Sequence, residues 1–341
     1  MSGFKEILAK LPDRIDLTEK EAEEAMSEIM HGHATDAQIA AYLMGLRMKG
    51  ETIEEITGSV RAMRDLAIRV PISDPQVVDT CGTGGDGSQT FNISTATAFV
   101  VAGAGITVAK HGNRSVSSRS GSADVLAALG VNIDLPPQKV GDCINEVGIG
   151  FLFAPLYHGA MKYCAKPRAE MGIRTLMNIL GPLSNPAGAT IQILGVYDAK
   201  LTEKLAQVLL RLGTQHCFVL HGMDGLDEIS LSGPTTIAEG KKGRVASYVV
   251  RPEDFGLKPV SPKELLGGTP QDNAKIILDI LRGSRGPKRD IILLNAAPAL
   301  VACRKATSLK TAFDEAGRIL DSGAPFEKLE QLISYTNAQA T

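Results

Sequence analysis

The sequence predicts an α/β protein with a small N-terminal all-helical domain and a larger α/β domain built on a mainly parallel central sheet. Two observations carry this prediction. Helix-start patterns recur through the first seventy residues, whereas short β-branched or apolar runs alternate with helical stretches from about residue 76 onward. Such alternation is typical of crossover units, in which helices bury both faces of a parallel sheet.

Three capping boxes mark the helices of the N-terminal unit. Residues 18–21, 35–38 and 52–55 each place a threonine three residues before an acid or amide that can reach back to the threonine amide. Gly32 and Gly50 follow the first two helical runs, where a left-handed residue favours termination.

The strands of the larger unit are predicted from short apolar runs. These runs are QVVDT, ITVAK, FLFAP, TIQILGVY, HCFVL and RVASYVV, with helical stretches such as 96–102, 124–129 and 202–212 between them. Residues 174–180 are also predicted to be helical, with an end at the Gly-Pro pair 181–182. In sheets of this kind the functional groups lie at the carboxyl ends of the strands.

These elements predict a discontinuous helical domain. We expect it to span residues 1–72 and to be completed by residues 172–188. Residues 73–171 and 189–341 then form the α/β domain.

The composition disfavours several classes of function. The net charge of −2 and the absence of a basic block argue against binding nucleic acid, and an aromatic content of 4% without tryptophan argues against base stacking. Five scattered cysteines without a C-x-x-C pair argue against a disulfide framework and a zinc site, and favour a reducing compartment. No signal peptide or bilayer-length apolar run is present, so we expect a cytoplasmic protein without a membrane partner.

The stretch DTCGTGGDGSQTFNIST, residues 79–95, suggests a phosphate cradle. Its glycines allow the backbone to approach a ligand closely, and Ser94 or Thr95 is expected to cap the following helix, whose amides and dipole favour an anion. The loop is not a Walker A sequence, because no G-K-[ST] follows. The alternative interpretation is an ordinary tight turn between a strand and a helix.

Cations follow the next predicted strand. Lys110, His111, Arg114 and Arg119 lie among serines and glycines in KHGNRSVSSRSGS. Because consecutive parallel strands usually lie close together, we expect this loop and the first one to share one edge of the sheet. The alternative is a solvated polar loop.

Two further features suggest ligand contacts. Asp227 and Glu228 are adjacent hard carboxylates suited to Mg²⁺, although an Asp-Glu pair is often only a solvated turn. Arg168 heads a helical run and could grip a carboxylate bidentately or pair with Glu170. The remaining histidines have no zinc-ligand spacing, and no G-x-S-x-G elbow or Ser-His-Asp arrangement is evident.

In combination, these motifs resemble the anthranilate phosphoribosyltransferase family. The resemblance rests on GTGGD (82–86), FNIST (91–95), KHGNRSVSS (110–118), LDE (226–228), Arg168 and NILGPLSNP (178–186), and it extends to NAAPAL (295–300). It implies a nucleoside phosphorylase/phosphoribosyltransferase-like fold, a homodimer formed through the helical domain, and Mg²⁺ as cofactor. It also implies the second step of tryptophan biosynthesis from chorismate: anthranilate and phosphoribosyl pyrophosphate (PRPP) give phosphoribosylanthranilate and pyrophosphate.

The resemblance also implies roles for individual residues. Anthranilate would contact Gly82, Asn113 and Arg168, and magnesium would be held by Ser94, Asp227 and Glu228. PRPP would be held by Gly82, Gly85, Asp86, Thr90, Asn92, Ile93, Ser94, Thr95, Lys110, His111, Gly112, Asn113, Arg114, Ser115, Val116, Ser117, Ser118 and Ser122.

No strict acid–base residue is expected in this chemistry. The acceptor amine is aromatic and already neutral, so electrostatic stabilisation of the leaving group and positioning can supply most of the rate. His111 is the candidate to take the amine proton after attack. Two rival interpretations are a pyrimidine-nucleoside phosphorylase, which needs no magnesium-binding acids, and a non-enzymatic ribose-phosphate binder.

Overall fold

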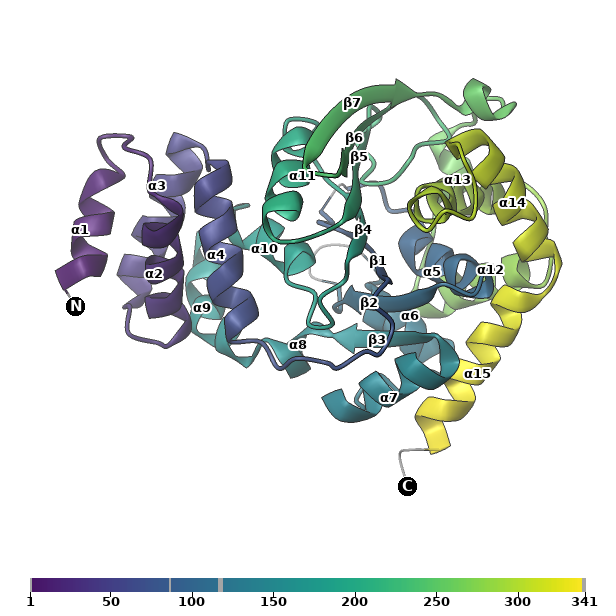
Figure 1. Ribbon diagram of the computed structural model, residues 1–341, viewed down its shortest axis with the longest axis horizontal. Helices are drawn as coiled ribbons and strands as arrows, with labels where there is room; N and C mark the ends of the chain where they lie inside the picture. Colours follow the sequence, from purple (N-terminus) through teal and green to yellow (C-terminus); the bar gives the residue numbers. More distant parts are fainter. Residues whose placement is uncertain (1, 86, 116–118, 339–341) are drawn as a thin grey trace.

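The computed structural model describes residues 2–85, 87–115 and 119–338. Along its longest axis the molecule places a group of helices, then a seven-stranded sheet, then a second group of helices (Figure 1). Among the described residues, no helix is both long enough and apolar enough to cross a bilayer.

The N-terminal group consists of α1 (Ser2–Lys10), α2 (Glu19–Met30), α3 (Asp36–Lys49) and α4 (Ile53–Asp65). The three predicted capping boxes are confirmed: Thr18, Thr35 and Thr52 each accept a bond from the amide three residues later, and the side chain there bonds back to the cap. Gly32 and Gly50 both have positive φ at the ends of α2 and α3.

The sheet contains seven strands in the order β3-β2-β1-β4-β5-β6-β7. The first five in sequence are parallel: β1 (Val77–Gly82), β2 (Thr107–Gly112), β3 (Ile149–Phe153), β4 (Ile191–Gly195) and β5 (His216–Gly222). The last two, β6 (Thr235–Lys241) and β7 (Arg244–Val250), are antiparallel. The strand order reverses between β1 and β4, so the topological switch point lies there.

Helices cover both faces of this sheet. On one face lie α5 (Ile93–Gly103), α12 (Pro270–Leu281), α13 (Pro287–Ala302), α14 (Leu309–Asp321) and α15 (Ala324–Ala338), which share one large apolar core with inward strand residues. The short α6 (Ser122–Ala128) packs against α12, and α7 (Pro137–Val147) packs against β3.

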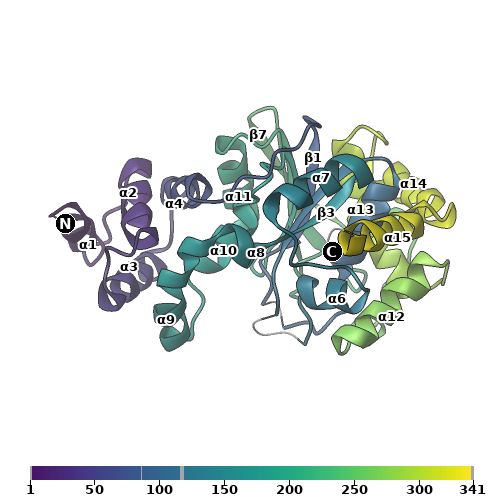
Figure 2. The ribbon, with the colours of Figure 1, turned by 90° about the horizontal axis from the view of Figure 1, so that it is seen from below.

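The opposite face joins the sheet to the N-terminal helices. Here lie α8 (Ala154–Tyr157), α9 (Lys162–Met171), α10 (Met177–Leu183) and α11 (Leu201–Arg211). Helix α9 packs against α2 and α3, and α10 packs against α4; α10 lies between the N-terminal helices and the sheet in the two views (Figures 1 and 2). A single apolar cluster runs from α1–α4 through α10 and α11 to β4 and β5, so the two units share a core.

One local prediction was wrong and one strand was missed. The helix predicted over 174–180 begins instead at Met177 and continues through Pro182 to Leu183, because Asn178 accepts from the Thr175 amide and closes a turn ahead of the helix. Strand β6 was not predicted at all, since TTIAEGK lacks a continuous apolar run.

Candidate active site

The candidate site lies at the carboxyl edge of the sheet, around the switch point between β1 and β4. Gly82 and Gly195 are the final residues of these two strands and are paired in register. Gly84 and Gly85 follow in the left-handed region, with φ of 63° and 73°, which other residues rarely adopt. The loop after β1 therefore turns sharply, as predicted.

The acidic loop after β5 lies directly over these two strand ends. The Gly84 amide donates to the Asp227 Oδ2 at 2.9 Å. A Cβ at Gly82 would overlap the Asp227 carboxylate, and one at Gly195 would overlap the Asp227 carbonyl oxygen. Because Gly82 and Gly195 have no side chains, they form a cradle in which the acidic loop can reach the switch point.

Asp227 and Glu228 are half-buried in this loop. Among the described residues, no three or more His, Cys, Asp or Glu side chains form a ready-made metal cluster. Two carboxylates set in a glycine cradle fit Mg²⁺, which usually keeps waters and binds through one or two carboxylates together with substrate phosphates. The donor set is therefore suited to a metal that arrives with a phosphorylated substrate.

Lys110 brings a positive charge to the same edge. Its side chain is 3% exposed, and its Nζ donates to the Thr80 carbonyl at 2.5 Å and to the Ser94 Oγ at 3.4 Å. Burial lowers the pKa of Lys110, and the charge of Asp79 opposes that shift most, with smaller contributions from Cys81, Glu228 and Asp227. The loops after β1 and β2 do share one edge, because the two strands are parallel neighbours.

The helix after the first loop begins differently from the prediction. Its N-cap is Asn92, not Ser94 or Thr95, which lie inside the first turn of α5. Asn92 makes no capping bond, because its side chain binds Ser120 and Asn273 instead. The side chains of Ile93 and Thr95 are buried, and the Ile93 amide donates to the Phe91 carbonyl at 2.8 Å.

Asn92 is a junction between three segments. Its Nδ2 donates to the Ser120 carbonyl at 3.0 Å, and its Oδ1 accepts from the Ser120 Oγ and from the Asn273 Nδ2 at 2.9 Å. Asn273 in turn accepts from the Gly268 amide, and Thr90 forms an isolated bridge with Leu266. The loop after β1 is thus tied both to the loop after β2 and to the start of α12.

The loop after β2 is organised by Asp124 of α6. The amides of Ser115 and Gly121 donate to its Oδ2, and Arg114 forms an ion pair with its Oδ1 at 3.0 Å. The Ser122 Oγ donates to the Asn113 carbonyl and occupies the space where a Cβ of Gly112 would lie. Arg114 therefore has an acidic partner in Asp124 while its side chain stays exposed, and its expected contact with the donor remains a prediction. Asp86, Val116, Ser117 and Ser118 lie outside the described residues.

His111 points to the opposite face of β2 from Lys110. It is 5% exposed, its ring lies edge-on to His158 at 5.2 Å, and burial lowers its pKa to about 3. The ring is therefore neutral at pH 7, and a base this weak holds a proton poorly. The His111 amide donates to Asp79, whose other oxygen accepts from Asn185.

Arg168 lies in α9 and is half-buried, and burial lowers its pKa. Among the described residues, no carboxylate lies within ion-pair distance of its guanidinium, and Glu170 instead lies 4.0 Å from Lys166. The expected alternative, an Arg168–Glu170 pair, is therefore absent from the described part of the chain.

Comparison with known proteins gives a consistent family. The helical bundle domain of the glycosyl transferase family matches residues 5–67, and the a/b domain of that family matches residues 74–326. The anthranilate phosphoribosyltransferase of Moorella thermoacetica is 56% identical over 324 residues, which cover 95% of this chain and 96% of that protein. The one from Desulfosudis oleivorans is 54% identical over 98% of this chain and 99% of its own length. The chain belongs to the anthranilate phosphoribosyltransferase family.

Solved structures of this family have the same fold. The anthranilate phosphoribosyltransferase of Thermus thermophilus superposes with a TM-score of 0.93 at 40% identity, covering 99% of this chain and all of that one. The Saccharomyces cerevisiae enzyme, solved with PRPP and Mg, has a TM-score of 0.87 at 28% identity, with coverages of 99% and 97%. The predicted fold class is confirmed.

Sequence reasoning missed four residues that hold this anthranilate phosphoribosyltransferase site together. Asp79 is fully buried, and Asn185 spans from Asp79 to the Ala109 carbonyl at 2.8 Å. Asn273 holds Asn92, and Arg174 stacks on the Tyr197 ring and donates to the Gly85 carbonyl. The sequence signal was their place inside recognised motifs, because Asp79 opens the stretch 79–95 and Asn185 lies within NILGPLSNP.

Proposed function

We propose that this chain transfers the 5-phosphoribosyl group of PRPP to the amine of anthranilate, releasing pyrophosphate. The observation that carries the proposal is the acidic loop seated on Gly82 and Gly195 at the switch point, with Lys110 beside it. A phosphorylase that uses free phosphate has no need for such an acidic pair. The sequence relatives and solved neighbours of the same family support the choice of substrates.

Residues near the ends of β1 and β2 stabilise the charge that develops during the reaction. As pyrophosphate leaves C1 of the ribose, negative charge grows on the leaving group and positive character grows on the sugar. Lys110 and the amides at the start of α5 stabilise the developing anion, while Asp227 and Glu228 would hold Mg²⁺, which supplies further Lewis-acid stabilisation when bound. Ser94, whose hydroxyl accepts from Lys110, completes this polar group.

The acceptor amine is held rather than activated. We assign to Arg168 the grip on the anthranilate carboxylate, supported by its half-buried guanidinium without an acidic partner among the described residues. Burial lowers the pKa of His111 and leaves the ring neutral at pH 7, so we assign the released proton to solvent or pyrophosphate. Positioning against C1 supplies the remaining rate.

The test mixes anthranilate, PRPP and Mg²⁺ with the protein and follows the loss of anthranilate fluorescence. Wild-type protein should turn over, and the double variant Asp227→Asn with Glu228→Gln should lose activity at every Mg²⁺ concentration. Glu253→Gln, a substitution at an exposed acid outside the site, serves as the matched control. Calorimetric PRPP binding without turnover would favour the non-enzymatic binder, and phosphorolysis of a pyrimidine nucleoside would favour the rival enzyme.

We also propose that two copies associate through the helical unit. Helix α3 buries one apolar face with Ile39, Leu43 and Leu46, yet Met44 and Met48 remain 39% and 70% exposed. Tyr163, on the adjacent α9, adds a further exposed ring. An apolar surface of this kind on a soluble protein often marks an interface.

Light scattering tests this association. Wild-type protein at micromolar concentration should have the mass of a dimer, and Met44→Lys with Met48→Lys should give monomers. Met223→Lys, at a residue that is 57% exposed in the loop after β5, is the control and should leave the mass unchanged. A monomeric wild-type protein would refute the proposal.

A further inference from the structure

Asn295 is a buried amide in the middle of α13, surrounded by apolar neighbours. It is 1% exposed, and burying an amide is unfavourable unless its polar atoms find partners. Its Oδ1 accepts from the Ile229 amide at 2.7 Å, and its Nδ2 donates to the Ile229 carbonyl at 3.1 Å and to the Ile291 carbonyl at 2.9 Å. One side chain thus binds both backbone groups of a single residue in a distant loop.

The residue so held immediately follows the acidic pair. Ile229 comes directly after Glu228, in a segment between β5 and β6 that has no regular secondary structure. Leu226, which precedes Asp227, is 3% exposed, and Ile229 is 1% exposed, so both flanks of the pair are anchored in the main core. The Gly222 amide also donates to the Leu226 carbonyl at 2.8 Å.

The rest of the loop is secured beyond Ile229. The Ser230 amide donates to the Thr235 Oγ1 at 2.9 Å, and the Ser230 Oγ donates to Asp224 at 2.6 Å. Asn295, in contrast, reaches the loop from the helical layer and binds the backbone next to Glu228. The backbone between Leu226 and Ile229, and with it the direction of the two carboxylates, is therefore set by contacts to the core and to α13.

We propose that Asn295 is a positioning residue for the transfer reaction, acting by holding Asp227 and Glu228 in the arrangement that binds the divalent metal with PRPP. This rests on the metal role proposed above for the two acids. Magnesium demands near-octahedral geometry, and removal of residues that orient metal ligands typically weakens metal binding about 10- to 100-fold. Asn295 touches neither substrate nor metal and acts through Ile229.

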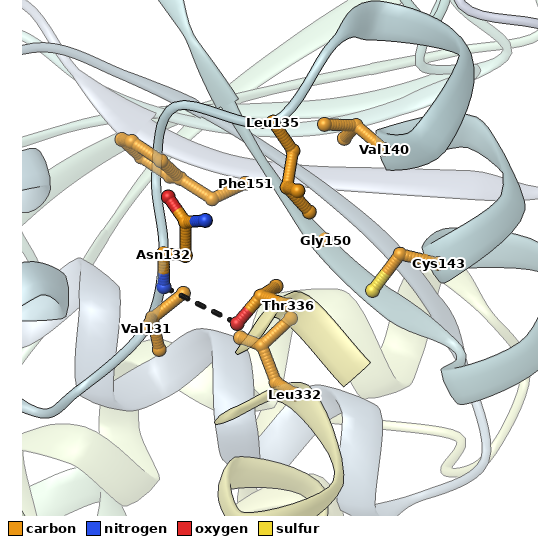
Figure 3. A pocket seen from close by; sticks show the side chains of 9 residues that line it. All are labelled: Val131, Asn132, Leu135, Val140, Cys143, Gly150, Phe151, Leu332 and Thr336. Atoms are coloured by element: carbon orange, nitrogen blue, oxygen red, sulfur yellow. Dashed lines mark hydrogen bonds between the residues drawn. The ribbon is translucent and has the colours of Figure 1, made fainter. Parts of the chain in front are cut away.

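The experiment compares wild type, Asn295→Leu and a matched control. Leucine has nearly the size of asparagine but makes no hydrogen bond, so it releases Ile229 without opening a large cavity. The control is Leu332→Ala in α15, which enlarges a small cavity against β3, the edge strand far from the acidic loop (Figure 3). It reduces stability without touching the loop.

Two readouts separate positioning from stability. Mn²⁺ binding in the presence of PRPP, followed by electron paramagnetic resonance, should weaken about 10- to 100-fold in Asn295→Leu and stay within about twofold of wild type in Leu332→Ala. In steady-state assays, the KM for PRPP at limiting Mg²⁺ should rise in the same proportion, and the KM for anthranilate should not change. Thermal unfolding should show a loss of stability in both variants.

The outcomes distinguish the two proposals. If Asn295→Leu binds Mn²⁺ and PRPP as wild type does, the positioning role is wrong while the proposed function stands. If wild-type protein shows no metal-dependent PRPP binding, the proposed function fails and the inference fails with it. Should Asn295→Leu not fold, Asn295→Ser, whose shorter side chain cannot span to both groups of Ile229, carries the same expectation.

Discussion

The paired rings of His111 and His158 predict how the fold responds to acid. Both side chains are buried and meet edge to face at 5.2 Å. Burial lowers the pKa of His111 to about 3 and that of His158 to about 4, and the neighbouring His158 lowers the pKa of His111 further. In the unfolded chain both histidines have the ordinary pKa of about 6.5. Protonation therefore favours the unfolded chain.

The magnitude follows from these pKa values. Because the folded pKa is depressed, the stabilisation is complete above pH 6.5 and is lost as pH falls toward the folded values. Between about pH 7 and pH 5 the contribution of each ring to the free energy of unfolding falls by about 2 kcal/mol, at about 1.4 kcal/mol per pH unit below the unfolded pKa. Asp79 acts in the opposite sense. Burial raises its pKa to about 6, so it takes up a proton in the folded state first, and this adds roughly 1 kcal/mol to the free energy of unfolding over the same pH interval. The net expected loss is about 3 kcal/mol.

Equilibrium urea unfolding, followed by circular dichroism at both pH values, measures this difference. In His158→Leu the decrease in the free energy of unfolding between pH 7 and pH 5 should be about 2 kcal/mol smaller than in wild type, because one of the two buried rings has been removed. The control is His33→Leu, which replaces an exposed histidine and should leave the difference as in wild type. If His158→Leu loses as much stability on acidification as wild type, the buried-ring account is refuted.

Three substitutions test the site in steady-state kinetics. Arg168→Lys should raise the KM for anthranilate about 10- to 100-fold and leave the KM for PRPP unchanged, since it removes a bidentate grip; equal effects on both would contradict the assignment. Gly195→Ala should lower kcat about 100-fold by displacing the Asp227 carbonyl, whereas Gly159→Ala, in open space, should not. Arg174→Leu should raise the KM for PRPP about tenfold by freeing the Gly85 carbonyl, with unchanged urea stability; an unaltered KM would count against it.

Local patterns were enough to predict much of this fold. The three capping boxes involve residues only three apart, so the sequence contains the whole interaction. Five of the six predicted apolar runs became parallel strands, because a strand buried on both faces needs a nearly continuous apolar sequence. The shared edge of the loops after β1 and β2 followed from their adjacency.

Contacts across long stretches of chain could not be predicted in this way. Asn92 follows a glycine-rich loop and resembles a cap in sequence, yet its side chain binds Asn273, 181 residues away. Asn295 stands in an apolar helix where nothing local indicates Ile229, 66 residues earlier, as its partner. Each contact depends on tertiary packing.

The alternation of side chains along β1 and β2 explains how one sheet edge can present two chemically different surfaces. Successive residues of a strand point to opposite faces. Thr80 and Lys110 accordingly meet Ser94 on the face of α5, where charge is concentrated. Asp79 and His111 point to the other face, where burial lowers the pKa of His111 and leaves it uncharged.

On the proposed function, this division favours the face of α5 for the donor. A polyanionic donor is held best where Lys110, the start of α5 and the acidic loop meet, whereas His111 is only 5% exposed on the other face. The glycines that end β1 and β4 leave room that the Asp227 carboxylate and the Asp227 carbonyl occupy, so the acidic loop sits directly on the two strand ends. Any side chain at Gly82 would displace the Asp227 carboxylate, and with it one of the two acids proposed to hold the metal.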